Sequence, residues 1–205
     1  CAALSWADGP TDNQAGKVRP VPPPGEAIAE DVRTDLERTT AALEEQIAAL
    51  RQSTNSVVRA HLSDAEVYLN AVDYALRFNE IYEPKREIDE ARDLLRRGAE
   101  RAALLKEGKA PWTNQTGLMV FGYVSKIDRS VQPYGLIVPP SVQHSPDQPR
   151  RLDAWFHGRG EKLSELSFVA GRLKSPGEFV PPGAFVLHLY GRYCNANKFA
   201  GEIDL

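Results

Sequence analysis

Residues 152–160 read LDAWFHGRG, and this stretch decides the fold class. Residues 152–156 form an apolar segment that stops at a turn containing Gly158 and Gly160. The next segment, residues 162–173, carries leucine and valine side chains near one helical face. Because glycine lets the backbone turn sharply and expose consecutive N–H groups, the stretch predicts a strand, an anion-holding turn and a helix.

Three other apolar segments surround this unit. Residues 118–124 and 134–138 flank a polar turn at residues 128–130 and predict a β-hairpin. Residues 184–189 predict a fourth strand. A hairpin followed by a strand–helix–strand unit is typical of α/β sheets with a right-handed crossover. We therefore expect an α/β domain over residues 111–205.

Residues 26–110 differ from the rest of the chain in having little proline and glycine. Between positions 26 and 107, Pro84 is the only proline and Gly98 the only glycine. Since proline and glycine disfavour helix interiors, this region predicts helices. Apolar side chains repeat at helical spacing through residues 28–50, residues 63–66 have the Ser-x-x-Glu form of a capping box, and Pro84 suits the first turn of a third helix. We expect a helical hairpin or bundle, whose apolar stripes pack on one another or bind a protein partner.

The first 25 residues form two segments. Residues 1–7, CAALSWA, end in the small-x-small pattern of a signal-peptidase site and predict a signal-peptide remnant. Two alternatives stay open: Cys1 as the lipid-bearing residue of a bacterial lipoprotein, and a cloning or gene-calling artefact. Residues 8–25 contain five prolines and predict an extended linker, with a Pro-rich docking ligand as the sharper alternative. Both functional interpretations of residues 1–7 imply a secreted or periplasmic protein.

The composition excludes several classes of protein. The chain is 42% apolar and 26% charged with a net charge of -3, which is typical of a globular protein and excludes collagen-like, membrane-embedded and wholly disordered chains. The acidic balance argues against nucleic-acid binding. With Cys1 and Cys194 the only cysteines and the histidines scattered, we expect no disulfide scaffold, metal or cofactor. His188, inside an apolar segment, is expected to be a hydrogen-bonded core residue.

Around His157 and Gly158 the sequence resembles the α/β-hydrolase superfamily. That fold opens with an antiparallel hairpin, and its third strand ends in a His-Gly motif whose loop supplies half of the oxyanion hole. Residues 125–139 resemble the two-strand opening of secreted bacterial esterases and prolyl oligopeptidase-like hydrolases, and residues 187–193 resemble the fourth strand and its exit loop. The resemblance covers residues 112–205.

The resemblance implies roles for several residues. The backbone N–H of Arg159, or of Gly158 beside it, would serve as an oxyanion-hole donor. His157 would tie the loop down and would not be the triad histidine. Tyr190 and Arg192 would line the mouth of a pocket for a small ester or peptide substrate.

The nucleophile that this resemblance requires is absent, because no Gly-x-Ser-x-Gly occurs in the 205 residues. We therefore expect an inactive fragment of a secreted serine hydrolase, truncated before the second half of its hydrolase domain. One alternative is a non-catalytic helical binding protein with a degenerate α/β scaffold. Another is a phosphate-binding protein that uses the turn at Gly158 and Gly160, although the phosphate-loop spacing is missing.

Overall fold

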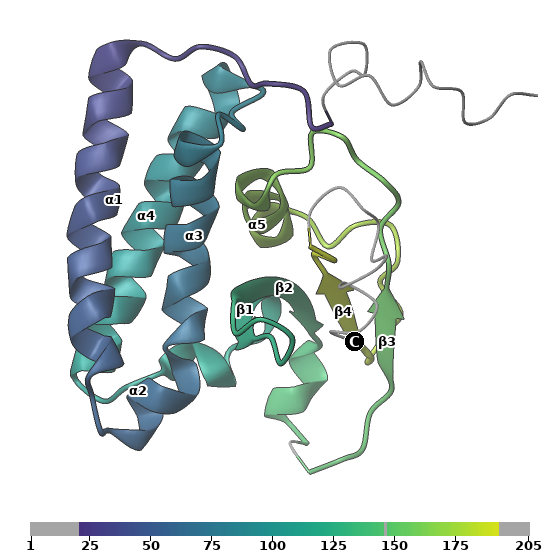
Figure 1. Ribbon diagram of the computed structural model, residues 1–205. Coiled ribbons are helices and arrows are strands. Elements are labelled where there is room, and N and C mark those ends of the chain that lie inside the picture. Colours follow the sequence, from purple (N-terminus) through teal and green to yellow (C-terminus); the bar gives the residue numbers. More distant parts are fainter. Residues whose placement is uncertain (1–20, 146, 193–205) are drawn as a thin grey trace, which may run out of the picture.

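The computed structural model describes residues 21–145 and 147–192. Within these residues, four α-helices come first and a small mixed sheet with one further helix follows (Figure 1). The helices and strands, in chain order, are α1 Glu30–Arg51, α2 Ser56–His61, α3 Ser63–Arg77, α4 Pro84–Lys106, β1 Gly117–Val124, β2 Val131–Val138, β3 Leu152–Trp155, α5 Glu165–Lys174 and β4 Phe185–Leu189. The predicted order of helices and strands is confirmed. The short helix α2, capped by the Asn55 side chain, was not predicted.

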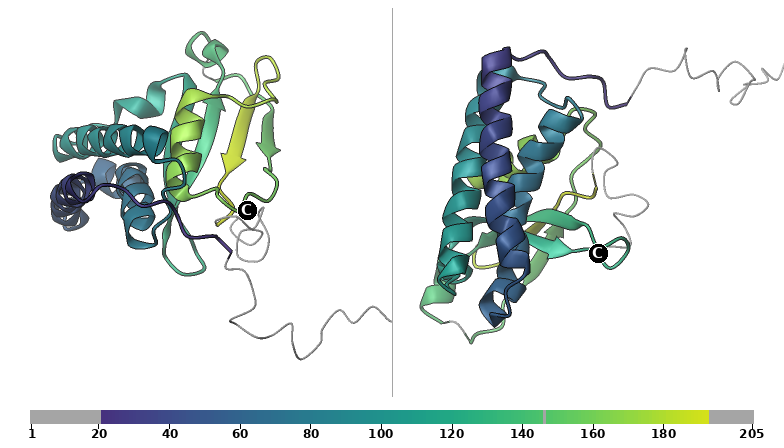
Figure 2. Two further views of the ribbon diagram at one scale, coloured as in Figure 1. Left: turned by 90° about the horizontal axis from the view of Figure 1, so that it is seen from above. Right: turned by 60° about the vertical axis from the view of Figure 1, so that its left-hand side comes forward.

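The helices α1, α3 and α4 each pack against the other two as a bundle, which forms the helical layer of the molecule (Figures 1 and 2). The predicted apolar stripe of α1 is buried through Leu36, Leu43 and Ile47. Gly98 of α4 is required by close packing, because a Cβ there would come within 2.7 Å of the Leu43 side chain. These contacts explain why the stripes need no external partner to be covered.

The capping box expected at residues 63–66 does not form. Ser63 does begin α3, but its hydroxyl donates to the Gly122 carbonyl at 2.9 Å, and Leu62 occupies the N-cap position. The Glu66 carboxylate accepts instead from Arg51 at 2.8 Å. Because a tertiary contact with β1 uses the serine hydroxyl, a local sequence pattern could not predict its partner.

The sheet has the strand order β1-β2-β4-β3. β1 pairs antiparallel with β2, β2 pairs antiparallel with β4, and β4 pairs parallel with β3. The predicted hairpin and the strand–helix–strand unit β3-α5-β4 are therefore present. The chain has an α/β fold, with helices followed by an open sheet of mixed direction.

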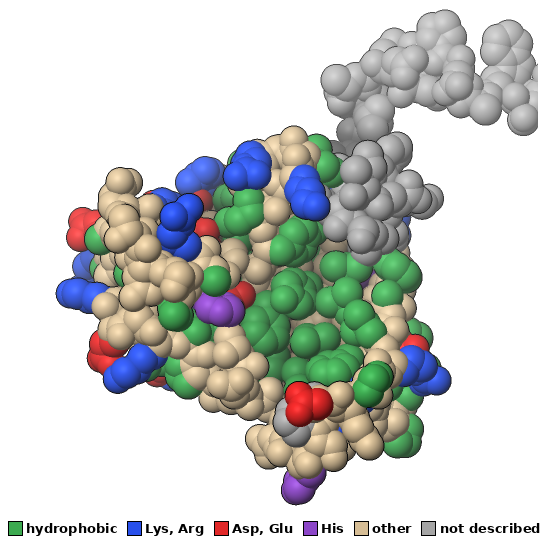
Figure 3. Space-filling model, turned by 90° about the horizontal axis from the view of Figure 1, so that it is seen from below, with side chains coloured by type: hydrophobic (Ala, Val, Ile, Leu, Met, Phe, Trp, Pro, Cys, Tyr) green, Lys and Arg blue, Asp and Glu red, His purple; other side chains and the backbone are tan. Residues whose placement is uncertain are grey.

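Helices α3 and α5 pack against each other and against one face of the sheet, where both contact β1 and β2 (Figure 2). The Arg172 side chain of α5 lies against Gly135 of β2, which pairs with His188 of β4, so these positions share the α5 face. Residues that alternate with them, such as Leu136 and its partner Leu187, point to the other face. Seen from below, hydrophobic side chains gather on that side of the molecule (Figure 3).

The helical layer and the sheet share one continuous hydrophobic core. Asp64 of α3 joins them, because its carboxylate accepts from Trp112 Nε1 and from the Gly122 backbone N–H of β1, each at 3.0 Å. Arg101 of α4 donates to the carbonyls of Asp64 and Val120 at 2.7 and 2.8 Å. The expected division at residue 110 therefore coincides with a change from helices to strands, but the core continues across it.

Candidate functional site

The loop at residues 157–160 lies at the carboxyl end of β3, beside the parallel strand β4. Gly158 and Arg159 are exposed, and a Cβ on Gly158 would meet no atom within 4 Å. Their backbone N–H groups donate to no other residue in the described part of the chain. The exposed loop therefore has two N–H groups without an acceptor among the described residues, and such groups can hold an anion.

His157 and Tyr190 hold this loop at two points. His157 Nε2 lies 2.8 Å from the Tyr190 carbonyl oxygen, and His157 Nδ1 lies 2.7 Å from that of Gly158. The Tyr190 hydroxyl donates to the Leu163 carbonyl at 3.1 Å. A neutral imidazole donates to one of its two carbonyls and an imidazolium to both. The loop is thereby fixed to the end of β4.

Tyr190 and Arg192, expected at the mouth of a substrate pocket, do share a cavity of about 410 Å³. Arg192 adopts a positive φ of 57°, and its guanidinium binds both carboxylate oxygens of Asp128 in the β1–β2 turn, at 2.7 and 3.1 Å. This pair and the Ser130 hydrogen bonds hold the pKa of Asp128 far below its usual range. Arg192 thus fastens the hairpin turn to the exit of β4.

Glu165 lines the same cavity and was not singled out from the sequence. It occupies the first turn of α5 and is only 6% exposed, and its Oε1 has no hydrogen-bond partner in the part of the chain that the structure describes. Burial, helped by the charge of Glu80, raises the pKa of Glu165 to about 8. An acidic residue after an N-cap serine is common in exposed helices, so the sequence carried no sign of this burial.

The expectation of a fully hydrogen-bonded core histidine at position 188 is only half met. His188 is 4% exposed; its Nδ1 lies 3.1 Å from Arg172 Nη1, but its Nε2 has no partner. Both residues line a second cavity of about 350 Å³ beneath the loop, with His157 and Gly158 at one side. The cavity joins residues from β3, α5 and β4 that no local motif connects.

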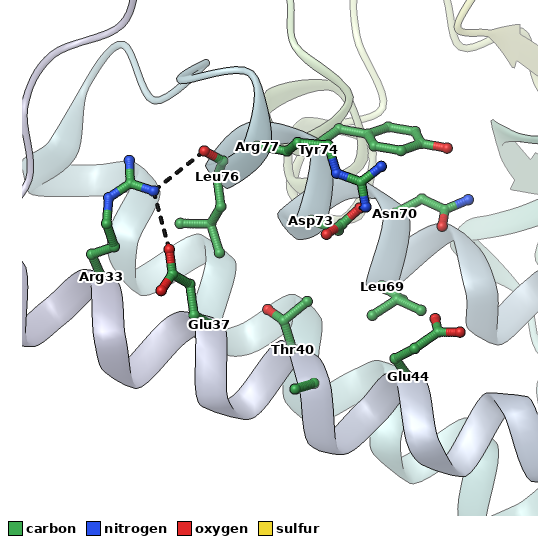
Figure 4. A pocket seen from close by; sticks show the side chains of 11 residues that line it. Arg33, Glu37, Thr40, Glu44, Leu69, Asn70, Asp73, Tyr74, Leu76 and Arg77 are labelled. Atoms are coloured by element: carbon green, nitrogen blue, oxygen red, sulfur yellow. Dashed lines mark hydrogen bonds and ion pairs between the residues drawn. The ribbon is translucent and has the colours of Figure 1, made fainter.

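A groove of about 840 Å³ lies between α1 and α3 (Figure 4). Its charged side chains bond to neighbours within the groove: Arg33 donates to the Glu37 carboxylate and to the Leu76 carbonyl, and Arg77 pairs with Asp73 at 2.6 Å. It is therefore a surface whose charges already have partners. If the chain is instead a non-catalytic helical binding protein, this groove is the surface at which a partner would be sought.

Other expected features lie partly or wholly outside the described residues. These are the signal-peptide remnant, most of the linker at residues 8–25, and Cys194. The described end of the linker lies against residues 79–81, where the Gly25 N–H donates to the Asn79 carbonyl at 2.7 Å. Among residues 21–145 and 147–192, no helix is long and apolar enough to cross a membrane, and no group of His, Cys, Asp and Glu side chains could hold a metal ion.

Comparisons with known proteins gave no relative. No family model, no curated protein and no solved structure matches this chain. The function is therefore argued from the site.

Proposed function

We propose that residues 112–205 form the opening part of the catalytic domain of a secreted serine hydrolase, an esterase or peptidase of α/β-hydrolase type. The single observation that carries this proposal is the exposed loop at the carboxyl end of β3, whose Gly158 and Arg159 N–H groups donate to no other described residue. Backbone N–H groups preorganised in this way can stabilise the oxyanion that develops during acyl transfer.

Two further features support the proposal. The hairpin β1–β2 precedes a parallel unit β3-α5-β4, which agrees with the opening described for the superfamily. His157 contacts the Tyr190 carbonyl and so fits a role in holding the loop, distinct from proton transfer. Each oxyanion-hole donor contributes roughly 10²–10³ in kcat in serine hydrolases. That gain in rate exceeds the loss of conformational entropy that comes from fixing the loop in one position.

In this proposal the missing groups are a serine nucleophile, an acid and a histidine encoded after Leu205. The nucleophile would attack the substrate carbonyl and form an acyl-enzyme that water hydrolyses. Residues 157–160 would bind the carbonyl oxygen as it becomes negative. Residues 1–205 would then lack activity by themselves.

The experiment is active-site labelling of the full-length gene product with a fluorophosphonate probe. We expect covalent labelling at a Gly-x-Ser-x-Gly serine, lost when that serine is replaced by alanine. A folded full-length protein that neither labels nor contains this motif would overturn the proposal. That outcome would favour the helical binding protein, for which the groove between α1 and α3 is the surface to test.

A further inference from the structure

Arg172 of α5 is directed onto the sheet by a glycine. A Cβ on Gly135 of β2 would lie 2.8 Å from Arg172 Cγ and 2.9 Å from Cδ, closer than real Cβ atoms approach. The missing side chain in β2 therefore leaves room for the aliphatic part of Arg172. This packing brings the guanidinium to His188 of β4, the strand partner of Gly135.

The guanidinium of Arg172 meets a neutral acceptor where a carboxylate would be usual. Arg172 can only donate, so His188 Nδ1 accepts and the imidazole proton lies on Nε2. Burial, together with the charge of Arg172 and then that of His157, lowers the pKa of His188 to about 4, so the ring is neutral near pH 7. In the described part of the chain, no Asp or Glu oxygen lies within 4 Å of the guanidinium.

The contrast with Arg101 shows what Arg172 lacks. Arg101 is also buried, but it donates to two carbonyls and lies 4.9 Å from the rings of Tyr68 and Trp112. Among the described residues, Arg172 has only the imidazole as a hydrogen-bond partner, and the other nitrogen of that imidazole is itself a buried donor without a partner there. A half-buried positive charge and an unsatisfied N–H therefore lie next to each other.

Arg172 and His188 both line the cavity of about 350 Å³, whose other walls are mainly apolar. Trp155, which stacks on Phe179 at 5.6 Å, and Phe168 provide aromatic surface. Gly171 leaves one side open, because a Cβ there would meet no atom within 4 Å. Glu178, an exposed carboxylate on the lining, disfavours ligands with several negative charges.

We propose that this cavity binds a small molecule with one carboxylate on an apolar or aromatic body, its carboxylate on Arg172 and its body against Trp155 and Phe168. A single negative charge matches the single uncompensated guanidinium, and cations are repelled by it. The inference is independent of the hydrolase proposal, because it needs no reaction.

The test is a titration of the 205-residue protein with phenylacetate, measured by calorimetry and by the change in tryptophan fluorescence, to which Trp155 in the cavity contributes. The matched neutral probe is phenylacetamide, which has nearly the same shape. We expect saturable binding of phenylacetate and at least about tenfold weaker binding of phenylacetamide, as removing a charge-assisted hydrogen bond requires. Equal affinity for the two probes, or no saturable binding of phenylacetate, would overturn the inference.

The variant that tests the residue is Arg172→Met, which keeps an unbranched apolar chain over Gly135 while removing the charge. The matched control is Arg151→Met, because Arg151 adjoins β3 but is exposed and pairs with Asp153 at 2.9 Å. We expect Arg172→Met to weaken phenylacetate binding by about tenfold or more and Arg151→Met to leave it unchanged. Equal effects of both variants would contradict the assignment. If thermal melts show that Arg172→Met unfolds, the comparison of the two probes on the unaltered protein decides.

Discussion

The helical layer and the α5 side of the sheet both bury polar and charged side chains, but the buried side-chain atoms found without a hydrogen-bond partner among the described residues lie on the α5 side. In the helical layer, Glu87 accepts from the backbone N–H groups of Tyr82 and Glu83 at 2.6 and 3.0 Å. Glu90 pairs with Arg86 and with Lys174. On the α5 side, Glu165 Oε1 and His188 Nε2 have no hydrogen-bond partner.

This difference indicates that the polar groups of the helical layer and those on the α5 side of the sheet have different roles. Buried polar groups cost free energy unless they are hydrogen-bonded, so the satisfied groups of the helical layer stabilise and orient the fold. Unsatisfied groups that line cavities are where binding or chemistry is sought, because a ligand can supply the missing partner. The predictions below alter one side of this comparison at a time.

The largest effect is expected for Asp64→Ala in the helical layer. This change leaves the buried N–H groups of Trp112 and Gly122 without an acceptor, and each such loss costs about 1–3 kcal/mol, so we expect the free energy of unfolding to fall by about 4 kcal/mol. Urea unfolding measures this value. Asp89→Ala is the control, because Asp89 is 81% exposed and its pair with Arg92 should contribute less than about 1 kcal/mol. Similar losses in the two variants would show that Asp64 does not join α3 to β1.

The next effect has the opposite sign and depends on pH. The pKa of Glu165 is about 8 in the folded protein and 4.5 in the reference state, so the folded state binds the proton more tightly. Stability is unaffected below the unfolded pKa, falls as pH rises between the two values, and stays reduced above the folded pKa. We expect Glu165→Gln to raise the free energy of unfolding by about 3 kcal/mol at about pH 9 and to change it little at about pH 4.

Denaturant unfolding at the two pH values checks this prediction. Glu45→Gln is the control, because Glu45 is exposed on α1 and should shift stability by less than about 0.5 kcal/mol at either pH. A Glu165→Gln variant that is less stable than the unaltered protein at high pH would mean that an acceptor at this position is satisfied.

The smallest effect concerns the start of α5. The Ser164 hydroxyl accepts from the Ser167 N–H at 3.2 Å and caps the helix, so Ser164→Ala should destabilise the protein by about 1 kcal/mol. Ser56→Ala serves for comparison, because Ser56 is an exposed first residue of α2 whose cap is Asn55. Thermal melts of both variants measure the difference, and an unchanged melting temperature for Ser164→Ala would refute the capping role.

Most of the fold could be predicted from the sequence, and the reason lies in local periodicity. The apolar repeat of residues 28–50, the proline at position 84 and the apolar segments that form β1 and β2 are each features of one continuous stretch of the chain. The Ser63 capping box failed because its hydroxyl bonds across 59 residues to Gly122. The pattern of neighbouring residues contains no information about such a distant partner.

The candidate site was predictable only in part. The loop at residues 157–160 carries its own signal, a His-Gly-x-Gly run after a strand. The pairing of Arg172 with His188 depends on a glycine in β2 and on the register of β2 with β4, and the burial of Glu165 depends on the packing of α5 against α3. These arrangements are tertiary, so Arg172 and Glu165 could not be distinguished in sequence from ordinary helix positions.

The central claim is tested most directly by removing single backbone N–H groups from the loop in the full-length gene product. Gly158→Pro and Arg159→Pro each delete one donor, while Gly158→Ala and Arg159→Ala keep it, and the Gly158 site has room for a Cβ. The measurement is kcat for a short-chain nitrophenyl ester, with thermal melts to confirm folding. We predict a loss of roughly 10²–10³ in at least one proline variant and less than about tenfold in both alanine variants. Folded proline variants that both turn over substrate like their alanine counterparts would contradict the oxyanion role of this loop.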